Sequence, residues 1–178
     1  PTNTTIEYNL HVGANLISFP AEGSIEIESG LPDDIEGSIS GIIGEGVATN
    51  NVNGVWSGSL SNFAGGEGYW VIATDYISFS FEISSLNRIK TSNSIGLTNP
   101  HGFETIQSTQ QAFYFINKIK TESGDELNDG WIISYHYGKV TGSREWKGDL
   151  IDIPVMGIDG NSYSQGYLHT GETPHFKY

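Results

Sequence analysis

Cysteine is absent from this 178-residue chain, which removes disulfide bonds, thiol nucleophiles and zinc–thiolate sites together. Basic residues are scarce as well: eight Lys and Arg stand against 21 Asp and Glu, for a formal net charge of −13. Nucleic-acid affinity depends on Lys and Arg that neutralise phosphates, so we expect no nucleic-acid partner. Binding to anionic membrane surfaces is disfavoured for the same reason.

Long apolar runs are also missing. No stretch reaches the about 18 apolar residues that a transmembrane helix needs, so we expect no membrane insertion. Glycine is abundant instead, with 23 residues, and β-branched and aromatic residues fill the segments between the glycine-rich turns. This composition favours strands joined by turns.

Sequence signals for catalysis are absent too. No Gly-x-Ser-x-Gly motif occurs, and no histidine has sequence neighbours that prepare it as a general base. A glycosidase needs two carboxylates that converge across a sugar cleft, but 21 acidic residues produce chance pairs whose spacing proves nothing. We therefore expect that the protein is not an enzyme, with glycoside hydrolysis as the weaker alternative.

Period-two alternation predicts a half-buried strand over residues 5–12. Further strands are expected at residues 69–73, 77–83, 111–119 and 131–137. Residues 24–37 can hold one short helix, because Gly30 and Pro32 limit its length. The pattern predicts an all-β protein: an antiparallel β-sandwich, arranged as two adjoining sandwich-like units with at most one short helix.

A polar zone at residues 84–99 favours a boundary near Thr91, between an N-terminal unit, residues 1–90, and a C-terminal unit, residues 91–178. One composite domain is the alternative. Trp-x-Gly-x-Leu occurs at both Trp56 and Trp146, but the match extends to no full period and indicates a duplication only weakly.

Several stretches are similar to known modules. LHVGANLISFPAEG (residues 10–23) and WSGSLSNFAGGEGYWVIAT (residues 56–74) resemble a module of secreted bacterial surface proteins. Residues 108–116, 126–150 and 152–177, with the element Pro-Val-Met-Gly-x-Asp-Gly, resemble a β-sandwich repeat of large exoproteins of environmental bacteria. The chain departs from the first pattern in lacking the usual Trp before Asn15, and it stops where the relatives carry further strands.

The resemblance implies an extracellular or cell-surface location and a non-catalytic structural or adhesive role. It leaves the ligand open, since such modules accompany adhesins and hydrolases alike. The closing TPHFKY reads as part of a strand, so we expect the natural chain to continue or this strand to pair with a neighbour. Open strand edges favour pairing with other copies or neighbouring modules, including filament assembly.

The alternative function is a carbohydrate-binding module that uses exposed aromatic residues of the second unit. Most Trp and Phe in a β domain belong to the core, and Trp56 and Trp70 are assigned to the core or to strand-capping positions because their neighbours are apolar. Tyr163 and Tyr167, between small polar residues, are the better exposed candidates. The predicted polysaccharide-contacting residues are Trp131, Tyr135, Tyr137, Asn161, Tyr163, Gln165 and Tyr167.

An acidic loop is the best candidate for a metal, and no other cofactor is expected. Asp125, Glu126, Asn128 and Asp129 offer hard oxygen ligands for calcium within a short segment, although EF-hand spacing is missing. The alternative is a solvated hairpin turn shaped by its Asp and Asn residues. A second loop, starting at Asp159, matches only the first two ligand positions and is a weaker calcium candidate.

Overall fold

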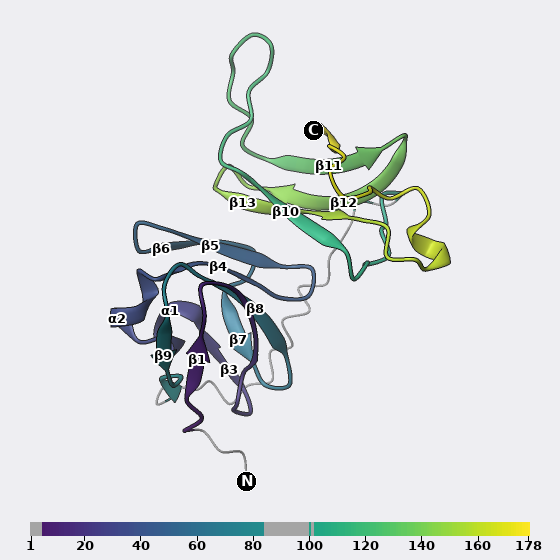
Figure 1. Ribbon diagram of the computed structural model, residues 1–178. Helices are drawn as coiled ribbons and strands as arrows, with labels where there is room; N and C mark the ends of the chain where they lie inside the picture. The colour runs from purple at the N-terminus through teal and green to yellow at the C-terminus, as the bar shows by residue number, and fades with distance from the viewer. Residues whose placement is uncertain (1–4, 84–99, 101) are drawn as a thin grey trace. The chain divides into compact units, whose positions relative to one another are not determined.

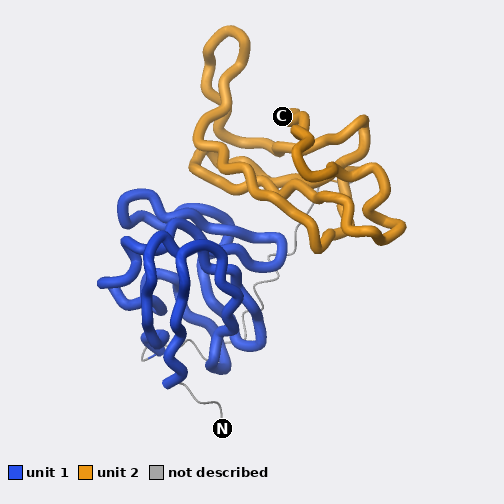
Figure 2. The backbone as a smooth tube through the Cα atoms, viewed as in Figure 1, with its two compact units in different colours: residues 1–95 blue, residues 96–178 orange. Residues whose placement is uncertain are grey.

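The computed structural model describes residues 5–83, 100 and 102–178 (Figure 1). Strands account for 46% of the described residues and helices for 8%, which confirms the predicted all-β, sandwich-like class. The chain forms two compact units, Pro1–Ile95 and Gly96–Tyr178 (Figure 2). The boundary predicted near Thr91 lies outside the described residues.

Unit 1 is built around a five-stranded antiparallel sheet in the order β2-β8-β4-β5-β6. Two separate two-stranded ribbons, β1-β9 and β3-β7, complete it. The strands are β1 (Tyr8–Leu10), β2 (Gly13–Ser18), β3 (Ser24–Glu26), β4 (Ile39–Ile43), β5 (Ala48–Val52), β6 (Val55–Gly58), β7 (Asn62–Ala64), β8 (Gly68–Ala73) and β9 (Ile77–Phe79). The predicted N-terminal strand therefore pairs within its own unit, through β1 and β9.

Two helical turns, α1 (Ile27–Gly30) and α2 (Asp33–Glu36), lie between β3 and β4, where the sequence predicted at most one short helix. Pro32 explains the division, because it has no N–H to donate and its ring excludes a continuous helix. It stands in extended conformation as the N-cap of α2. No helix of the described chain has the length and apolar character that crossing a bilayer requires.

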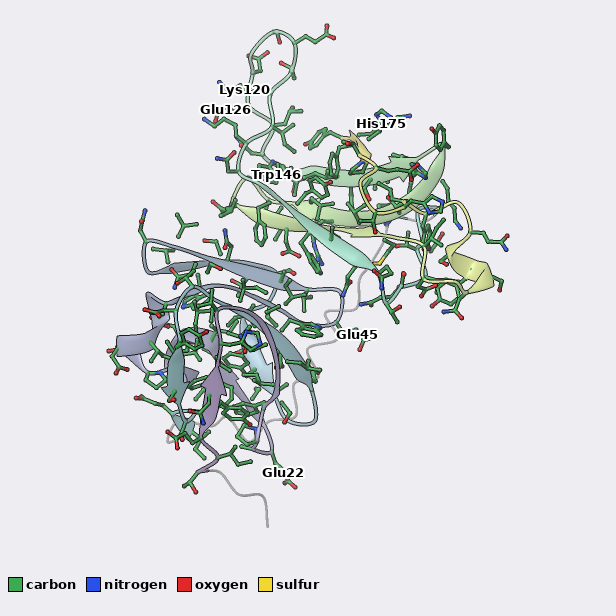
Figure 3. The ribbon with its side chains drawn as sticks, in the orientation of Figure 1. Glu22, Glu45, Lys120, Glu126, Trp146 and His175 are labelled. Carbon is green, nitrogen blue, oxygen red and sulfur yellow. The ribbon has the colours of Figure 1, made fainter. Side chains whose placement is uncertain are left out.

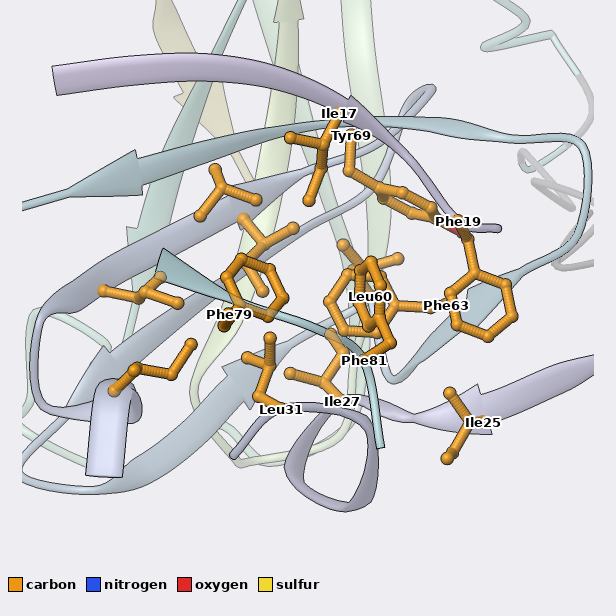
Figure 4. Packing of buried hydrophobic residues seen from close by; sticks show 14 of the residues in the cluster. Ile17, Phe19, Ile25, Ile27, Leu31, Leu60, Phe63, Tyr69, Phe79 and Phe81 are labelled. Carbon is orange, nitrogen blue, oxygen red and sulfur yellow. The ribbon is translucent and has the colours of Figure 1, made fainter. Parts of the chain in front are cut away.

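The core of unit 1 lies between the five-stranded sheet and the two ribbons (Figure 4). Phe63 is at its centre and is fully buried. Its ring lies 4.9 Å from Phe81 and 5.0 Å from Tyr69, both edge to face, and 6.0 Å from Phe19 in a stacked arrangement. Alternation along β2 and β8 brings Ile17, Tyr69 and Val71 onto this inner face.

Unit 2 contains a three-stranded sheet in the order β12-β11-β14 and a separate antiparallel pair, β10-β13, whose strands are far apart in sequence. The elements are β10 (Gln111–Ile116), β11 (Gly130–His136), β12 (Lys139–Trp146), β13 (Ile151–Met156), the 3₁₀ turn η2 (Ser162–Ser164) and β14 (His175–Lys177). Strands β12 and β13 approach closely at Gly142, where an added Cβ would lie 1.8 Å from the Pro154 carbonyl oxygen. Only glycine permits this approach.

The interior of unit 2 is mixed. Ile132, Trp146 and Ile153 form a buried apolar cluster. Beside it the Arg144 guanidinium donates to the Asp152 carboxylate at 2.8 Å, and both side chains are buried. The Ser134 hydroxyl lies 2.9 Å from that of Thr141. Directional polar contacts therefore share the interior with apolar packing.

Candidate functional site

A groove of about 480 Å³ opens where the β11–β12 turn meets β14. Tyr135 on β11 lies directly opposite His175 on β14, and directly opposed residues of antiparallel strands point to the same face. The strand pairing therefore brings an aromatic ring and an imidazole to one wall. The lining residues are Tyr135, His136, Tyr137, Gly138, Glu172, Thr173, His175 and Lys177.

The turn that forms the rim of this groove has an unusual backbone. Tyr137 has φ = 44° and Gly138 has φ = 84°, so both central residues of the β11–β12 turn are left-handed. Paired positive φ values match the twist of a tight hairpin, and glycine accepts them without cost. A bulky aromatic residue does so only with strain, a feature that occurs preferentially at functional sites. The turn leaves the Tyr137 side chain 92% exposed.

His136 and Glu172 hold the groove together. The Nε2 atom of His136 lies 3.1 Å from a Glu172 carboxylate oxygen, and its Nδ1 lies 3.1 Å from the Gly166 carbonyl oxygen. The same Glu172 oxygen accepts the backbone N–H of His169 at 2.7 Å. These contacts tie the segment before β14 to β11, so the groove is formed without a ligand.

Several polar groups of the lining are available to a ligand. Within the described chain, the hydroxyls of Tyr137 and Thr173 and the ring of His175 have no hydrogen-bond partner. The Lys177 ammonium lies 5.1 Å from the centre of the Tyr135 ring and covers one face of it. The Tyr137 ring contacts the His136 ring, with centroids 4.5 Å apart, but its side chain stays 92% exposed and so offers an accessible ring beside these donors and acceptors.

The predicted carbohydrate residues divide into separate places. Tyr135 and Tyr137 line the groove. Trp131 is half-buried and lies on the same face of β11 as Tyr135, four residues earlier, but outside the groove lining. The remaining four, Asn161, Tyr163, Gln165 and Tyr167, belong to the loop after β13.

Asp159 organises that loop. Its carboxylate accepts the Tyr163 hydroxyl at 2.7 Å, the Asn161 N–H at 3.0 Å and the Thr109 N–H at 3.2 Å. The Tyr163 hydroxyl and these N–H groups hold the pKa of the Asp159 carboxyl well below its usual range. The same bond raises the pKa of Tyr163. The Asp159 oxygens therefore bind the chain's own donors, which leaves the weaker calcium hypothesis without geometric support.

Tyr167 is buried, in contrast to the exposed ring that the sequence predicted. Its hydroxyl donates to the Ile106 carbonyl at 2.9 Å and accepts the Ile106 N–H at 3.1 Å. The Lys139 ammonium lies 4.2 Å from its ring centre and donates to the carbonyls of Tyr163 and Gln165. Desolvation by burial raises the pKa of Tyr167. A tyrosine enclosed in this way offers no face for a sugar.

The carboxylates of the acidic loop between β10 and β11, where Figure 3 labels Glu126, have different partners. Glu126 binds Lys118 at 2.7 Å, which lowers the Glu126 pKa, and Asp125 accepts the Ser123 hydroxyl at 2.6 Å. Asp129 lies 3.7 Å from the Lys147 ammonium. The fourth predicted ligand, Asn128, packs against Gly148.

No three His, Asp or Glu side chains of residues 5–83, 100 and 102–178 gather as metal ligands do. The predicted calcium ligands in the acidic loop are thus near one another in sequence, but the structure does not bring their oxygens to one point.

Sequence reasoning missed part of the groove and misplaced one tryptophan. Glu172, Thr173 and Lys177 gave no signal, because their nearness to Tyr137 depends on the pairing of β14 with β11. Of the two positions expected for Trp70, core or strand-capping, the core is wrong, because Trp70 is 46% exposed on β8. Alternation around the buried Tyr69 and Val71 could have shown that Trp70 points outward.

Comparison with known proteins adds no relative. None of the family models, curated proteins or solved structures compared with this chain matches it. The resemblance to bacterial surface modules therefore stays a prediction, and the groove beside Tyr137 is the feature that indicates a function.

Proposed function

We propose that the protein is a non-catalytic adhesive module of a bacterial surface or secreted protein, and that the groove at Tyr137 binds carbohydrate. The observation that supports this function best is the Tyr137 ring, held open to solvent on a left-handed turn beside polar groups without partners. A pyranose presents C–H groups to such a ring and hydroxyls to the polar groups around it.

The charge of the groove supports a neutral sugar. Its lining contains one carboxylate, Glu172, and one ammonium, Lys177, although the whole chain carries a net charge of −13. Balanced charges favour neither an anionic nor a cationic ligand. The tight turn fixes the backbone of Tyr137, so only its side chain must be ordered when a ligand stacks on it.

The test is binding of the full chain to a panel of neutral polysaccharides, measured by calorimetry and by the shift in melting temperature. Tyr137→Gly is the sharpest variant, because glycine accepts the positive φ and removes only the ring. We expect affinity to fall at least about tenfold in this variant, as for loss of a central aromatic anchor, with folding intact. Tyr137→Phe keeps the ring and should bind within a few-fold of the unmodified chain.

Tyr76→Gly provides the control, since Tyr76 is 76% exposed in unit 1 and remote in sequence from the groove. It should bind as the unmodified chain does. The proposal is wrong if no neutral polysaccharide binds, or if binding survives Tyr137→Gly.

Strand pairing with neighbouring modules is a second candidate function. It is supported by β14, which ends the order β12-β11-β14 and exposes all three of its residues. An open edge of this kind accepts a further strand. Self-association of the full chain, measured by sedimentation, that survives removal of apolar side chains would favour this function.

A further inference from the structure

A second pocket, of about 280 Å³, lies wholly within unit 1. Its lining comes from the β5–β6 hairpin, from the segment after β6, and from the segment that runs from β3 into α1. One wall is apolar and includes Ile27 and Leu60, which belong to the core (Figure 4). The other lining groups are an indole ring, hydroxyls, an amide and two carboxylates.

The Thr49 hydroxyl is a buried polar group without a partner. Thr49 lies directly opposite the buried Ile42, so its side chain points to the inner side of the sheet. Its neighbour on the other side is Gly58, which has no side chain to cover it. Only 2% of Thr49 is exposed, yet its hydroxyl has no hydrogen-bond partner among residues 5–83, 100 and 102–178.

This hydroxyl faces the pocket. Every fully enclosed side-chain nitrogen or oxygen of the described residues has a hydrogen-bond partner. The unpartnered Thr49 oxygen must therefore border open space, and the pocket is the space that Thr49 lines. A buried hydroxyl left without a partner is costly, so a ligand that donates to it removes that cost.

Two carboxylates of the lining also have no partner. Glu26 and Glu28 are exposed, and neither makes a hydrogen bond or ion pair within the described part of the chain. Residues 5–83 contain no Lys or Arg that could neutralise them. Across the described residues no three acidic or His side chains gather as metal ligands do. The pocket is therefore anionic, and its donor set suits an organic cation better than a metal ion.

Trp56 gives the pocket an aromatic wall that is fixed before a ligand enters. Its indole N–H donates to a Glu36 carboxylate oxygen at 2.9 Å. Asn51, directly opposite Trp56 on the hairpin, donates to the Glu36 carbonyl at 3.0 Å. An indole ring attracts a cation, and the hydrocarbon part of such a ligand can pack against Ile27 and Leu60.

We infer that this pocket binds an alkylammonium group, carried either by a free amine or by a lysine side chain. An ammonium has three N–H donors and no acceptor, which matches the Thr49 hydroxyl and the carboxylates of Glu26 and Glu28. A neutral sugar would leave both carboxylates without a counter-charge. A bare metal ion would gain nothing from the apolar wall.

The test is titration of the full chain, followed by calorimetry and by the NMR signal of the Trp56 indole N–H. The probes are n-butylammonium, Nα-acetyl-lysine methylamide and the uncharged Nα-acetyl-norleucine methylamide. We expect saturable binding of amine at about millimolar concentration, weaker in added salt, and at least about tenfold weaker binding of the norleucine compound. Equal affinity for the two amines indicates a free amine as the source, and tighter binding of the lysine compound indicates a peptide side chain.

Two variants test the contacts. Thr49→Val keeps the shape and removes the hydroxyl, so amine affinity should fall about tenfold. The double variant Glu26→Gln/Glu28→Gln should lower it by about tenfold as well. Glu45→Gln is the matched control, because Glu45 is an exposed acid of unit 1 outside the pocket lining (Figure 3). It should bind amines as the unmodified chain does.

Three results would overturn the inference. They are no binding of either amine, equally tight binding of the norleucine compound, and binding that survives both Thr49→Val and the double variant. Calcium that shifts the Trp56 signal more strongly than the amines do would assign the pocket to a metal ion instead. Tyr137→Gly should leave amine binding unchanged, because the groove belongs to unit 2, so this test and the carbohydrate test fail separately.

Discussion

The two units are built from the same kind of strand, yet their interiors differ. Unit 1 buries one large apolar cluster in which three other aromatic rings contact Phe63. Unit 2 has a small cluster of Ile132, Trp146 and Ile153 beside a buried ion pair. Unit 1 is thus stabilised mainly by apolar burial, whereas in unit 2 apolar packing shares the interior with directional polar contacts.

The difference has consequences for specificity and stability. Apolar burial stabilises in proportion to area and tolerates repacking. A buried ion pair adds little net stability, but leaving one partner alone is costly. In unit 2 the Gly142–Pro154 approach and the Ser134 hydroxyl further restrict how the strands align. We expect unit 1 to lose stability gradually on mutation and unit 2 to be sensitive to single polar positions.

The largest expected effect tests the apolar core. Phe63→Ala should lower the free energy of unfolding of unit 1 by about 4 kcal/mol, because it removes the ring that three others contact. Urea unfolding followed by methyl NMR separates the units, since Ile17 and Ile42 report on unit 1 and Ile132 and Ile153 on unit 2. An equal loss at Ile132 and Ile153 would show that the two interiors are not independent.

The next prediction tests the polar interior of unit 2. Asp152→Ala should cost about 3 kcal/mol, since it leaves the Arg144 guanidinium buried without its carboxylate. The double variant Arg144→Met/Asp152→Leu should recover most of that loss. The same unfolding experiment measures both. If the double variant is as unstable as the single one, the ion pair contributes more than its desolvation cost and our description of unit 2 is wrong.

The smallest effect concerns the loop that Asp159 organises. A carboxyl whose pKa is depressed on folding stabilises the folded state above its unfolded pKa of about 3.9, and the contribution is lost as pH falls below that value. Tyr163→Phe removes the strongest cause, so the Asp159 pKa should rise toward its ordinary value. NMR titration of the carboxyl carbon measures the change. Tyr135→Phe is the control and should leave Asp159 unaffected.

Local sequence patterns predicted a large part of the fold. The Asn53-Gly54 pair forms the hairpin between β5 and β6 with positive φ at both residues, and Asn-Gly is the residue pair that most favours such a turn. Strands were also expected at residues 69–73 and 131–137, where β8 and β11 lie. The same patterns identified Tyr135 and Tyr137 as ligand candidates, and both line the groove.

Other assignments required contacts that no local pattern contains. Tyr163 and Tyr167 stand between small polar residues, so they read as exposed, but the hydroxyl of Tyr167 binds Ile106 more than sixty positions away in the chain. The carboxylates of the acidic loop are close in sequence but turn to Lys118, Ser123 and Lys147. Sequence spacing reports nearness along the chain and not the direction of a side chain.

The sequence by itself determined the all-β class of this protein, because alternation and glycine-rich turns make strands. Only the tertiary structure decided which side chains a ligand can reach. Pairing of β14 with β11 assembled the groove around Tyr137, and pairing of β5 with β6 placed Gly58 beside Thr49 in the pocket of unit 1. The physical reason is that burial depends on which strands become neighbours, and that pairing is decided by long-range packing.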